Sequence, residues 1–211
     1  MLNEVRSMLL IEKLSFSVIT LFILLGQGGG CEANAANASG EVGPDTLKKW
    51  HDICISGNVK QIDDQIDNFE KHLNSNSNDY LAQVYLGGAY ALRAKASFWG
   101  PSKLSYLKRA EKMMDTAVAA APSDARVRMV NAIGSYRIPV RFKRRAIAVR
   151  DFKILVPIAK SDDGELTVRE RQAVLYYAFL TFTEEGINGA QELKGLCHQL
   201  DSGSKYGKLT Q

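Results

Sequence analysis

Small residues, and larger ones that could pack against them, recur in the middle of this chain at intervals that would bring two helices into close contact. They are Leu86, Gly87 and Tyr90 in a first segment, followed by Ala110, Met114, Ala117 and Pro122 in a second. Because Gly87 has no side chain, a facing helix can approach its backbone closely. Tyr90 and Met114 have the size to fill the remaining gap, and Pro122 ends the second helix because it cannot donate a backbone hydrogen bond. The spacing therefore predicts a tightly packed pair of helices.

This pattern resembles the tetratricopeptide repeat, a helix–turn–helix unit with the signature W-x2-L-G-x2-Y…A-x3-F-x2-A-x4-P. The resemblance implies an all-α fold in which about four antiparallel helix pairs stack as a superhelix. It also implies a protein that holds partners in a groove. The chain departs from the signature at Gln83, where the family has Trp. The stretch from Gly87 to Pro122 is also longer than the 34-residue period allows, by about eleven residues. We expect the extra residues in a loop between the two helices, around 97–102.

The first 35 residues have the features of a secretory signal peptide. Basic residues precede an apolar run at 18–25, which is shorter than the ~20 apolar residues that a membrane-spanning helix needs. Two A-x-A cleavage patterns follow, at 33–35 and 36–38. We therefore expect residues 1–35 to be removed on export to the periplasm or beyond, and residues 36–44 to be a flexible lead-in.

Two alternatives to soluble export remain open. Gly28-Gly29-Gly30-Cys31 loosely resembles a bacterial lipobox, although Gly28 stands where an aliphatic residue is usual. A lipid on Cys31 would anchor the mature chain to a membrane. The apolar run could also be retained as an anchor.

Residues 45–201 are expected to form a single helical domain, because apolar side chains recur at helical spacing about eight times. Eight such helices with short turns make four antiparallel pairs, which must stack to bury their apolar faces. A closed helical bundle is the alternative. Residues 202–211 are polar and are expected to be a frayed tail. The expected helices are 45–56, 59–73, 79–97, 103–121, 125–139, 145–160, 167–185 and 188–201.

The titratable and thiol side chains show no catalytic or metal-binding pattern. His51, His72 and His198 lie on three different helices, without the close spacing of metal ligands. The sequence has no G-x-S-x-G, H-E-x-x-H or phosphate-loop motif. Cys54 and Cys197 fall on apolar helical faces near opposite ends of the domain, so two buried thiols are favoured over a disulfide. We therefore expect no enzymatic activity, no cofactor and no metal.

Basic side chains gather between residues 137 and 153. This segment holds seven Lys or Arg residues and one acid, Asp151, whereas the whole chain has a net charge of only +4. Such a cluster could bind an acidic protein or anionic lipid headgroups. Alternatively, it is a solvated loop and helix start that keeps the protein soluble. Nucleic acid is not expected, because few aromatic residues interleave the cluster. The candidate binding residues are Arg137, Arg141, Lys143, Arg144 and Arg145.

The expected loop at 97–102 is the second candidate site. Phe98, Trp99 and Tyr106 surround the dipeptide Gly100-Pro101, which restricts the course of the backbone. Long loops between packed helices are often functional, and Trp and Tyr are favoured as binding anchors. One interpretation places Trp99 over the mouth of a groove. The other has Phe98 and Trp99 close the end of the core.

These features predict an exported, non-enzymatic binding or scaffold protein that presents a helical-repeat groove to a protein or peptide partner. The alternative is a periplasmic small-ligand carrier, in which the groove and the Trp99 loop enclose an apolar or anionic compound. The sequence indicates neither the identity of the partner nor the oligomeric state.

Overall fold

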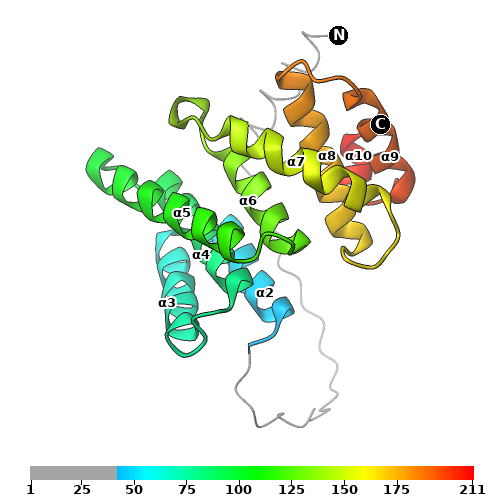
Figure 1. Cartoon of the computed structure of the whole chain (residues 1–211). Coiled ribbons are helices and arrows are strands. Elements are labelled where there is room, and N and C mark those ends of the chain that lie inside the picture. Colours follow the sequence, from blue (N-terminus) through cyan, green and yellow to red (C-terminus); the bar gives the residue numbers. More distant parts are fainter. Residues whose placement is uncertain (1–41) are drawn as a thin grey trace, which may run out of the picture. The chain divides into compact units, whose positions relative to one another are not determined.

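The computed structural model describes residues 42–211, which form nine α-helices and one short 3₁₀-helix, η1 (Figure 1). No strand occurs in this part of the chain. The expected signal peptide (1–35), Cys31 and most of the lead-in lie outside the described residues. The helices are α2 (Pro44–Ser56), α3 (Val59–Ser75), α4 (Tyr80–Ala96), α5 (Gly100–Ala120), α6 (Ala125–Arg137), η1 (Val140–Phe142), α7 (Arg145–Lys160), α8 (Val168–Glu184), α9 (Ala190–Leu200) and α10 (Lys205–Leu209).

Polar side chains fix the starts of four helices. Asn58 caps α3 and Thr167 caps α8, each in a reciprocal capping box with the residue three positions later. Asp79 and Asp124 cap α4 and α6 by accepting hydrogen bonds from backbone N–H groups of the first turn. Because these caps are local in sequence, the observed starts agree with the predicted ones to within about one residue.

Consecutive helices pack as pairs: α2 with α3, α4 with α5, α6 with α7 and α8 with α9. The pairs stack on one another: the first helices α2, α4, α6 and α8 pack in sequence, and the second helices α3, α5 and α7 also pack against the first helix of the next pair. Figure 1 shows the pairs following one another, from α2 and α3 on one side to α8 and α9 on the other. The predicted all-α class with stacked helix pairs is therefore confirmed.

Met114 lies at the junction of three helices. A Cβ placed on Gly87 of α4 would lie 2.6 Å from Met114 Cγ, and one on Gly134 of α6 would lie 2.9 Å from Met114 Sδ. Ala110 and Ala117 are completely buried on the same side of α5. The predicted close approach of the two helices at Gly87 is confirmed, and the same methionine also seats α6.

The expected loop at 97–102 is wrong. Helix α4 ends at Ala96 and α5 begins at Gly100, so only three residues connect them. The extra residues lengthen the helices instead: α5 has 21 residues and α4 has 17, whereas α6 has 13. Pro101 lies in the first turn of α5, where its missing N–H needs no partner, so it starts a helix there rather than fixing a loop.

The expected fraying of residues 202–211 is also wrong. Helix α10 packs against α8 and α9, and Ser204 caps it by accepting a hydrogen bond from the Gly207 N–H. Gly207 is buried, and His198 Nδ1 lies 2.9 Å from its carbonyl oxygen. A Cβ on Gly207 would lie 2.0 Å from the Asp201 carbonyl oxygen, so a glycine is needed for this docking.

Cys54 and Cys197 are buried free thiols, as the sequence predicts. Burial raises the pKa of Cys54 to about 12 and also raises the pKa of Cys197, so both stay protonated at neutral pH. Within residues 42–211, no helix combines the length and the apolar character needed to cross a bilayer.

Gly87→Ala should destabilise the domain, because the new Cβ would also lie 3.0 Å from the Ala110 carbonyl oxygen, which cannot easily move. We expect the free energy of unfolding in urea to fall by about 1–3 kcal/mol, the usual range for overpacking. Gly195→Ala in α9 is the matched control, since its Cβ would meet nothing within 4 Å. It should be neutral or stabilising by up to ~1 kcal/mol, because alanine favours helix. Similar losses in both variants would contradict the close contact at Gly87.

Candidate functional site

The first helices of the four pairs form one continuous surface, which we call the first-helix surface. On α2, the His51 ring lies 5.0 Å from the ring of Tyr85, and its Nε2 lies 2.6 Å from where a Cβ on Gly88 would be. On α6, Arg126 forms an ion pair with Glu170 of α8 at 3.1 Å. Neighbouring first helices therefore touch directly, and the surface is assembled by packing between pairs.

His51 is held uncharged by this packing. Burial lowers the pKa of His51 to about 4; the negative charge of Asp52 opposes this shift, and smaller effects of Arg137 and Lys48 add to it. At neutral pH the imidazole therefore packs against α4 as a neutral aromatic ring.

Helix α6 contributes a basic and aromatic part of the first-helix surface. Arg126, Ile133 and Arg137 recur at helical spacing on one side of this helix. The exposed Arg137 guanidinium lies 5.5 Å from the Tyr177 ring of α8, and Tyr136 packs edge-on against Tyr177 at 5.6 Å. Arginine beside tyrosine is a combination enriched in protein interfaces.

Arg145 extends this cluster but is neutralised by α8. Its guanidinium lies 4.2 Å from the Tyr136 ring and pairs with Glu184 at 2.8 Å, with a longer contact to Glu185 at 3.8 Å. The Tyr136 hydroxyl donates a 2.9 Å hydrogen bond to Glu184 as well. Arg145 therefore ties the start of α7 to the end of α8.

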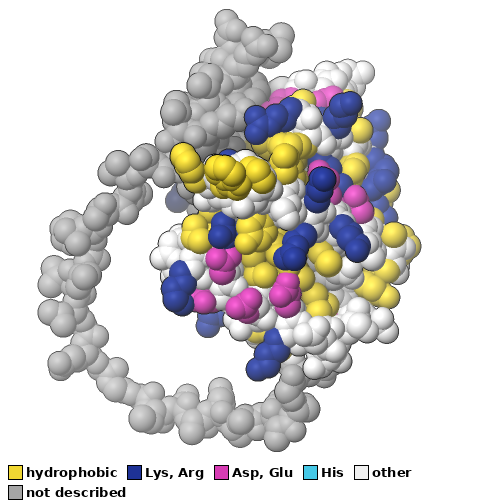
Figure 2. Space-filling view, turned by 90° about the vertical axis from the view of Figure 1, so that its left-hand side faces the viewer, with side chains coloured by type: hydrophobic (Ala, Val, Ile, Leu, Met, Phe, Trp, Pro, Cys, Tyr) yellow, Lys and Arg dark blue, Asp and Glu magenta, His cyan; other side chains and the backbone are white. Residues whose placement is uncertain are grey.

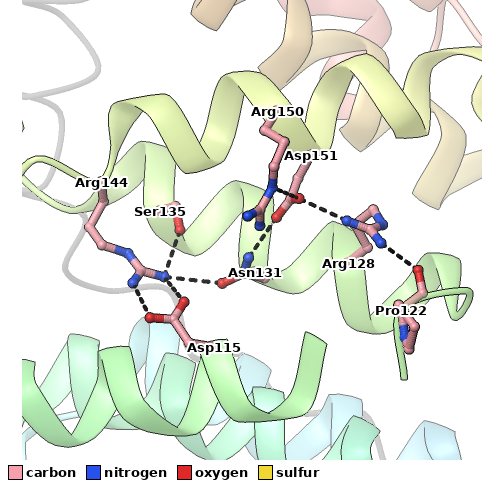
Figure 3. Close-up of polar contacts among 8 residues, drawn as sticks. All are labelled: Asp115, Pro122, Arg128, Asn131, Ser135, Arg144, Arg150 and Asp151. Atoms are coloured by element: carbon pink, nitrogen blue, oxygen red, sulfur yellow. Dashed lines mark hydrogen bonds and ion pairs between the residues drawn. The ribbon is translucent and has the colours of Figure 1, made fainter. Parts of the chain in front are cut away.

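A second polar cluster joins α5, α6 and α7 (Figure 3). Arg144 lies immediately before α7 and donates two hydrogen bonds, of 2.7 and 2.8 Å, to the Asp115 carboxylate of α5. The same guanidinium donates to Asn131 at 3.2 Å and to Ser135 at 3.1 Å, both on α6. One arginine thus connects three helices.

The other half of this cluster centres on Asp151 of α7, which is completely buried. Its carboxylate accepts hydrogen bonds from Arg128 at 2.9 Å, Asn131 at 2.6 Å and Arg150 at 3.0 Å. Arg128 also donates to the Pro122 carbonyl oxygen. A buried carboxylate is tolerated only when it is paired and hydrogen-bonded, so these residues fix the helix arrangement.

The structure divides the basic cluster predicted between residues 137 and 153. Arg137, Arg141 and Lys143 are exposed, whereas only 5% of Arg144 is accessible and Arg145 is paired with α8. The expectation of one solvated charged surface is therefore wrong for Arg144. Its charge is neutralised inside the domain by an acid from another helix, and it is not available to a partner.

The three predicted aromatic residues also separate. Phe98 and Trp99 stand exposed at the α4–α5 turn, with exposed fractions of 102% and 65%. The interpretation that they close the core is therefore wrong. Tyr106 does not join them, because its ring stacks on Tyr90 at 6.1 Å and lies 4.8 Å from the Arg93 guanidinium.

Sequence reasoning missed the acids that complete these clusters. Asp115 is 29 positions from Arg144, and no local spacing connects the two. Glu184 and Glu170 likewise occupy ordinary polar positions on a helix, and only the stacking of the pairs brings them to Arg145 and Arg126.

Among residues 42–211, no three His, Cys, Asp or Glu side chains lie together in a way that could hold a metal ion. No protein-family model matches this chain, and neither a curated protein nor a solved structure matches it. The tetratricopeptide resemblance therefore rests on the residues around Gly87 and on the stacking of helix pairs.

Arg144→Met should destabilise the domain by about 2–3 kcal/mol, because Asn131 and Ser135 lose a buried hydrogen-bond donor and Asp115 loses its pair. Lys143→Met is the matched control, because Lys143 is the neighbouring residue and is exposed. We expect its free energy of unfolding to change by no more than about 0.5 kcal/mol. Urea unfolding of both variants measures the difference. Equal stability of the two variants would mean that Arg144 is not structural.

Acid should destabilise the domain through His51. Its folded pKa of about 4 lies below the ordinary value of 6.5, so the unfolded chain takes up the proton first as the pH falls. The contribution of neutral His51 to the free energy of unfolding is therefore complete above about pH 6.5. It falls by on the order of 2–3 kcal/mol between about pH 6.5 and 4. His51→Gln should flatten this part of the profile of unfolding free energy against pH. A variant with the same slope as the parent would assign the acid sensitivity to other groups.

Proposed function

We propose that this protein is exported and binds a protein or peptide partner on its first-helix surface, without catalysing a reaction. The observation that carries the proposal is the direct packing of α2, α4, α6 and α8, which builds one surface from four helix pairs. Extended surfaces of this kind, assembled from stacked repeats, are what helical-repeat proteins use to bind partners.

The chemistry of α6 favours a partner segment that carries an acidic group beside an apolar one. Arg137 is exposed and forms no ion pair with an acid of the described residues, whereas Arg126 is paired with Glu170. A carboxylate approaching Arg137 would lie next to the half-buried Tyr136 ring, which can contact an apolar side chain.

Support for export comes from residues 1–35, through the apolar run, the preceding basic residues and the A-x-A patterns. Attachment through Cys31 is the alternative outcome of the same hypothesis. Intact-mass analysis of the protein from its native envelope separates a chain that begins near Ala36 from one that carries a diacylglycerol group on Cys31.

The small-ligand carrier gains no support from the position of Trp99. That alternative requires Trp99 over a groove, but Trp99 lies at the α4–α5 turn. It lines neither of two surface hollows, one formed by α3, α4 and α5 and the other by α5, α6 and α7.

A photo-crosslinking residue at Ile133 should capture the partner in the native host. Ile133 lies on the first-helix surface between Arg126 and Arg137 and is half-buried. The matched control is the same substitution at Ile154 on α7, which is 44% exposed and should therefore capture more if contacts are random. We expect a discrete protein adduct from Ile133 alone, and its loss when Arg137→Ala is added. Adducts of equal yield at both positions, or none at Ile133, would contradict the proposal.

A further inference from the structure

Exposed apolar side chains gather where the two helices of a pair meet. Of the eight large hydrophobic residues that are exposed among residues 42–211, six lie at or beside such turns: Ile55, Val59, Phe98, Trp99, Leu104 and Val140. In Figure 1, the turns within the pairs lie along one side of the stack, and the connections between pairs lie along the other. We call the side formed by the turns α2–α3, α4–α5 and α6–α7 the turn edge.

The α4–α5 turn projects beyond the rest of the turn edge. Helix α5 is held to the neighbouring pair at Asp115 by Arg144. Fifteen residues of α5 precede that anchor, a length of about 22 Å in an α-helix. In Figure 1, the start of α5 stands away from the other helices. The extra residues of this pair therefore lift Phe98 and Trp99 out as a convex tip.

The turn edge is basic as well as apolar. The segments 55–62, 93–110 and 137–150 contain no Asp or Glu, although acids are frequent elsewhere in the chain. Lys103 and Lys108 lie in the first turns of α5 beside the tip, and Arg141 and Lys143 lie exposed at the α6–α7 turn. Figure 2 looks onto the side of α3 and α5, and shows hydrophobic side chains gathered there, with Lys and Arg side chains and several Asp and Glu side chains around them.

The excess of basic side chains does not continue at the fourth pair. The α8–α9 connection begins with Glu184 and Glu185, and α9 carries Glu192 in its first turn. The basic charge is concentrated at the α4–α5 and α6–α7 turns, because Lys60 beside the α2–α3 turn is paired with Asp64.

We propose that the turn edge docks on an anionic lipid bilayer, with Phe98 and Trp99 inserted among the headgroups. Tryptophan is favoured at the boundary between water and hydrocarbon, where its ring is buried and its N–H stays hydrated. Lysine and arginine near an anionic surface are attracted to the phosphates, and here Lys103, Lys108, Arg141 and Lys143 supply that attraction.

The shape of the tip favours a lipid surface over a folded partner. Phe98 is as exposed as an isolated side chain, and neither Phe98 nor Trp99 lines the hollow formed by α3, α4 and α5 or the one formed by α5, α6 and α7. The headgroup region of a lipid bilayer is deformable, so it can surround a convex tip on all sides without a complementary pocket. This docking uses a different part of the molecule from the first-helix surface, so it can be tested independently of the proposed partner binding.

Trp99 is its own reporter for the test. The sequence contains two tryptophans, so Trp50→Phe leaves Trp99 as the single fluorescent tryptophan in the full chain. Phenylalanine keeps an aromatic ring at position 50, where Trp50 packs edge-on against Phe69 at 5.2 Å. We expect its emission to shift to shorter wavelength with phosphatidylcholine vesicles that contain phosphatidylglycerol, and to be quenched when the lipids carry bromine on their acyl chains. Vesicles of phosphatidylcholine alone should give neither effect.

A control reporter separates insertion of the tip from attachment by another part of the chain. Trp50→Phe, Trp99→Phe and Ile154→Trp together place the tryptophan on the exposed side of α7. This reporter should stay unquenched on the same vesicles, even if residues 1–41 hold the chain at the membrane. Quenching of both reporters alike would overturn the assignment of the tip.

Charge variants test the second half of the proposal. Lys103→Ser with Lys108→Ser should weaken the Trp99 response at least tenfold and flatten its salt dependence, because screening acts on exposed charges. Lys71→Ser with Lys153→Ser removes the same charge from exposed sites on α3 and α7 and should change the response less than twofold. Equal losses in the two double variants would overturn the role of the tip lysines.

Two further outcomes would also overturn the proposal. One is a Trp99 response that is equal on neutral and anionic vesicles. The other is a shift of Trp99 emission with protein concentration in the absence of lipid, which would show a second copy of the chain covering the tip. Phe98→Ser with Trp99→Ser should abolish vesicle quenching of a reporter at Val140→Trp while leaving the melting temperature unchanged, because both side chains are exposed.

Discussion

The seating of Met114 between two glycines is the contact on which the arrangement of the central helices depends. Gly87 of α4 and Gly134 of α6 both leave room for this one side chain of α5, and Ala110 and Ala117 keep the same side of α5 small. A close approach fixes the course of α5 over α4 and α6. It thereby brings Asp115, the next residue of α5, to Arg144 at the start of α7, and directs the free end of α5 outward.

Packing of the helices divides the arginines of α6 and α7 between internal ion pairs and the exposed surface. In sequence they form one basic segment, but two acids from other helices and one acid within the segment divide it. Asp115 of α5 pairs with Arg144, Glu184 of α8 pairs with Arg145, and the buried Asp151 holds Arg128 and Arg150. Removing one partner of a buried ion pair strongly destabilises a protein. These arginines therefore stabilise the stacking of the second, third and fourth helix pairs. Arg137, Arg141 and Lys143, which lie between the end of α6 and the start of α7, keep charges that face outward.

The two proposed surfaces differ in chemistry because they are built differently. The first-helix surface arises where the pairs pack side by side, and it combines tyrosine rings with arginines, which suits a specific protein contact. The turn edge arises where the chain reverses within each pair, and it combines protruding apolar side chains with lysines. If both proposals hold, the molecule binds its partner while one edge rests on a membrane.

Features that depend on neighbours along the chain could be predicted from the sequence alone. Asp79, Asp124 and Thr167 mark helix starts because a cap bonds only to the turn that follows it, and the apolar spacing gives the helix pairs. The close contact at Gly87 follows in the same way from one short pattern. The structure was needed to show that the extra residues around Pro101 extend helices, that the tail after Asp201 docks, and which arginines stay exposed. The last two depend on partners far away in sequence, and a buried group or charge finds such a partner only when the pairs have stacked.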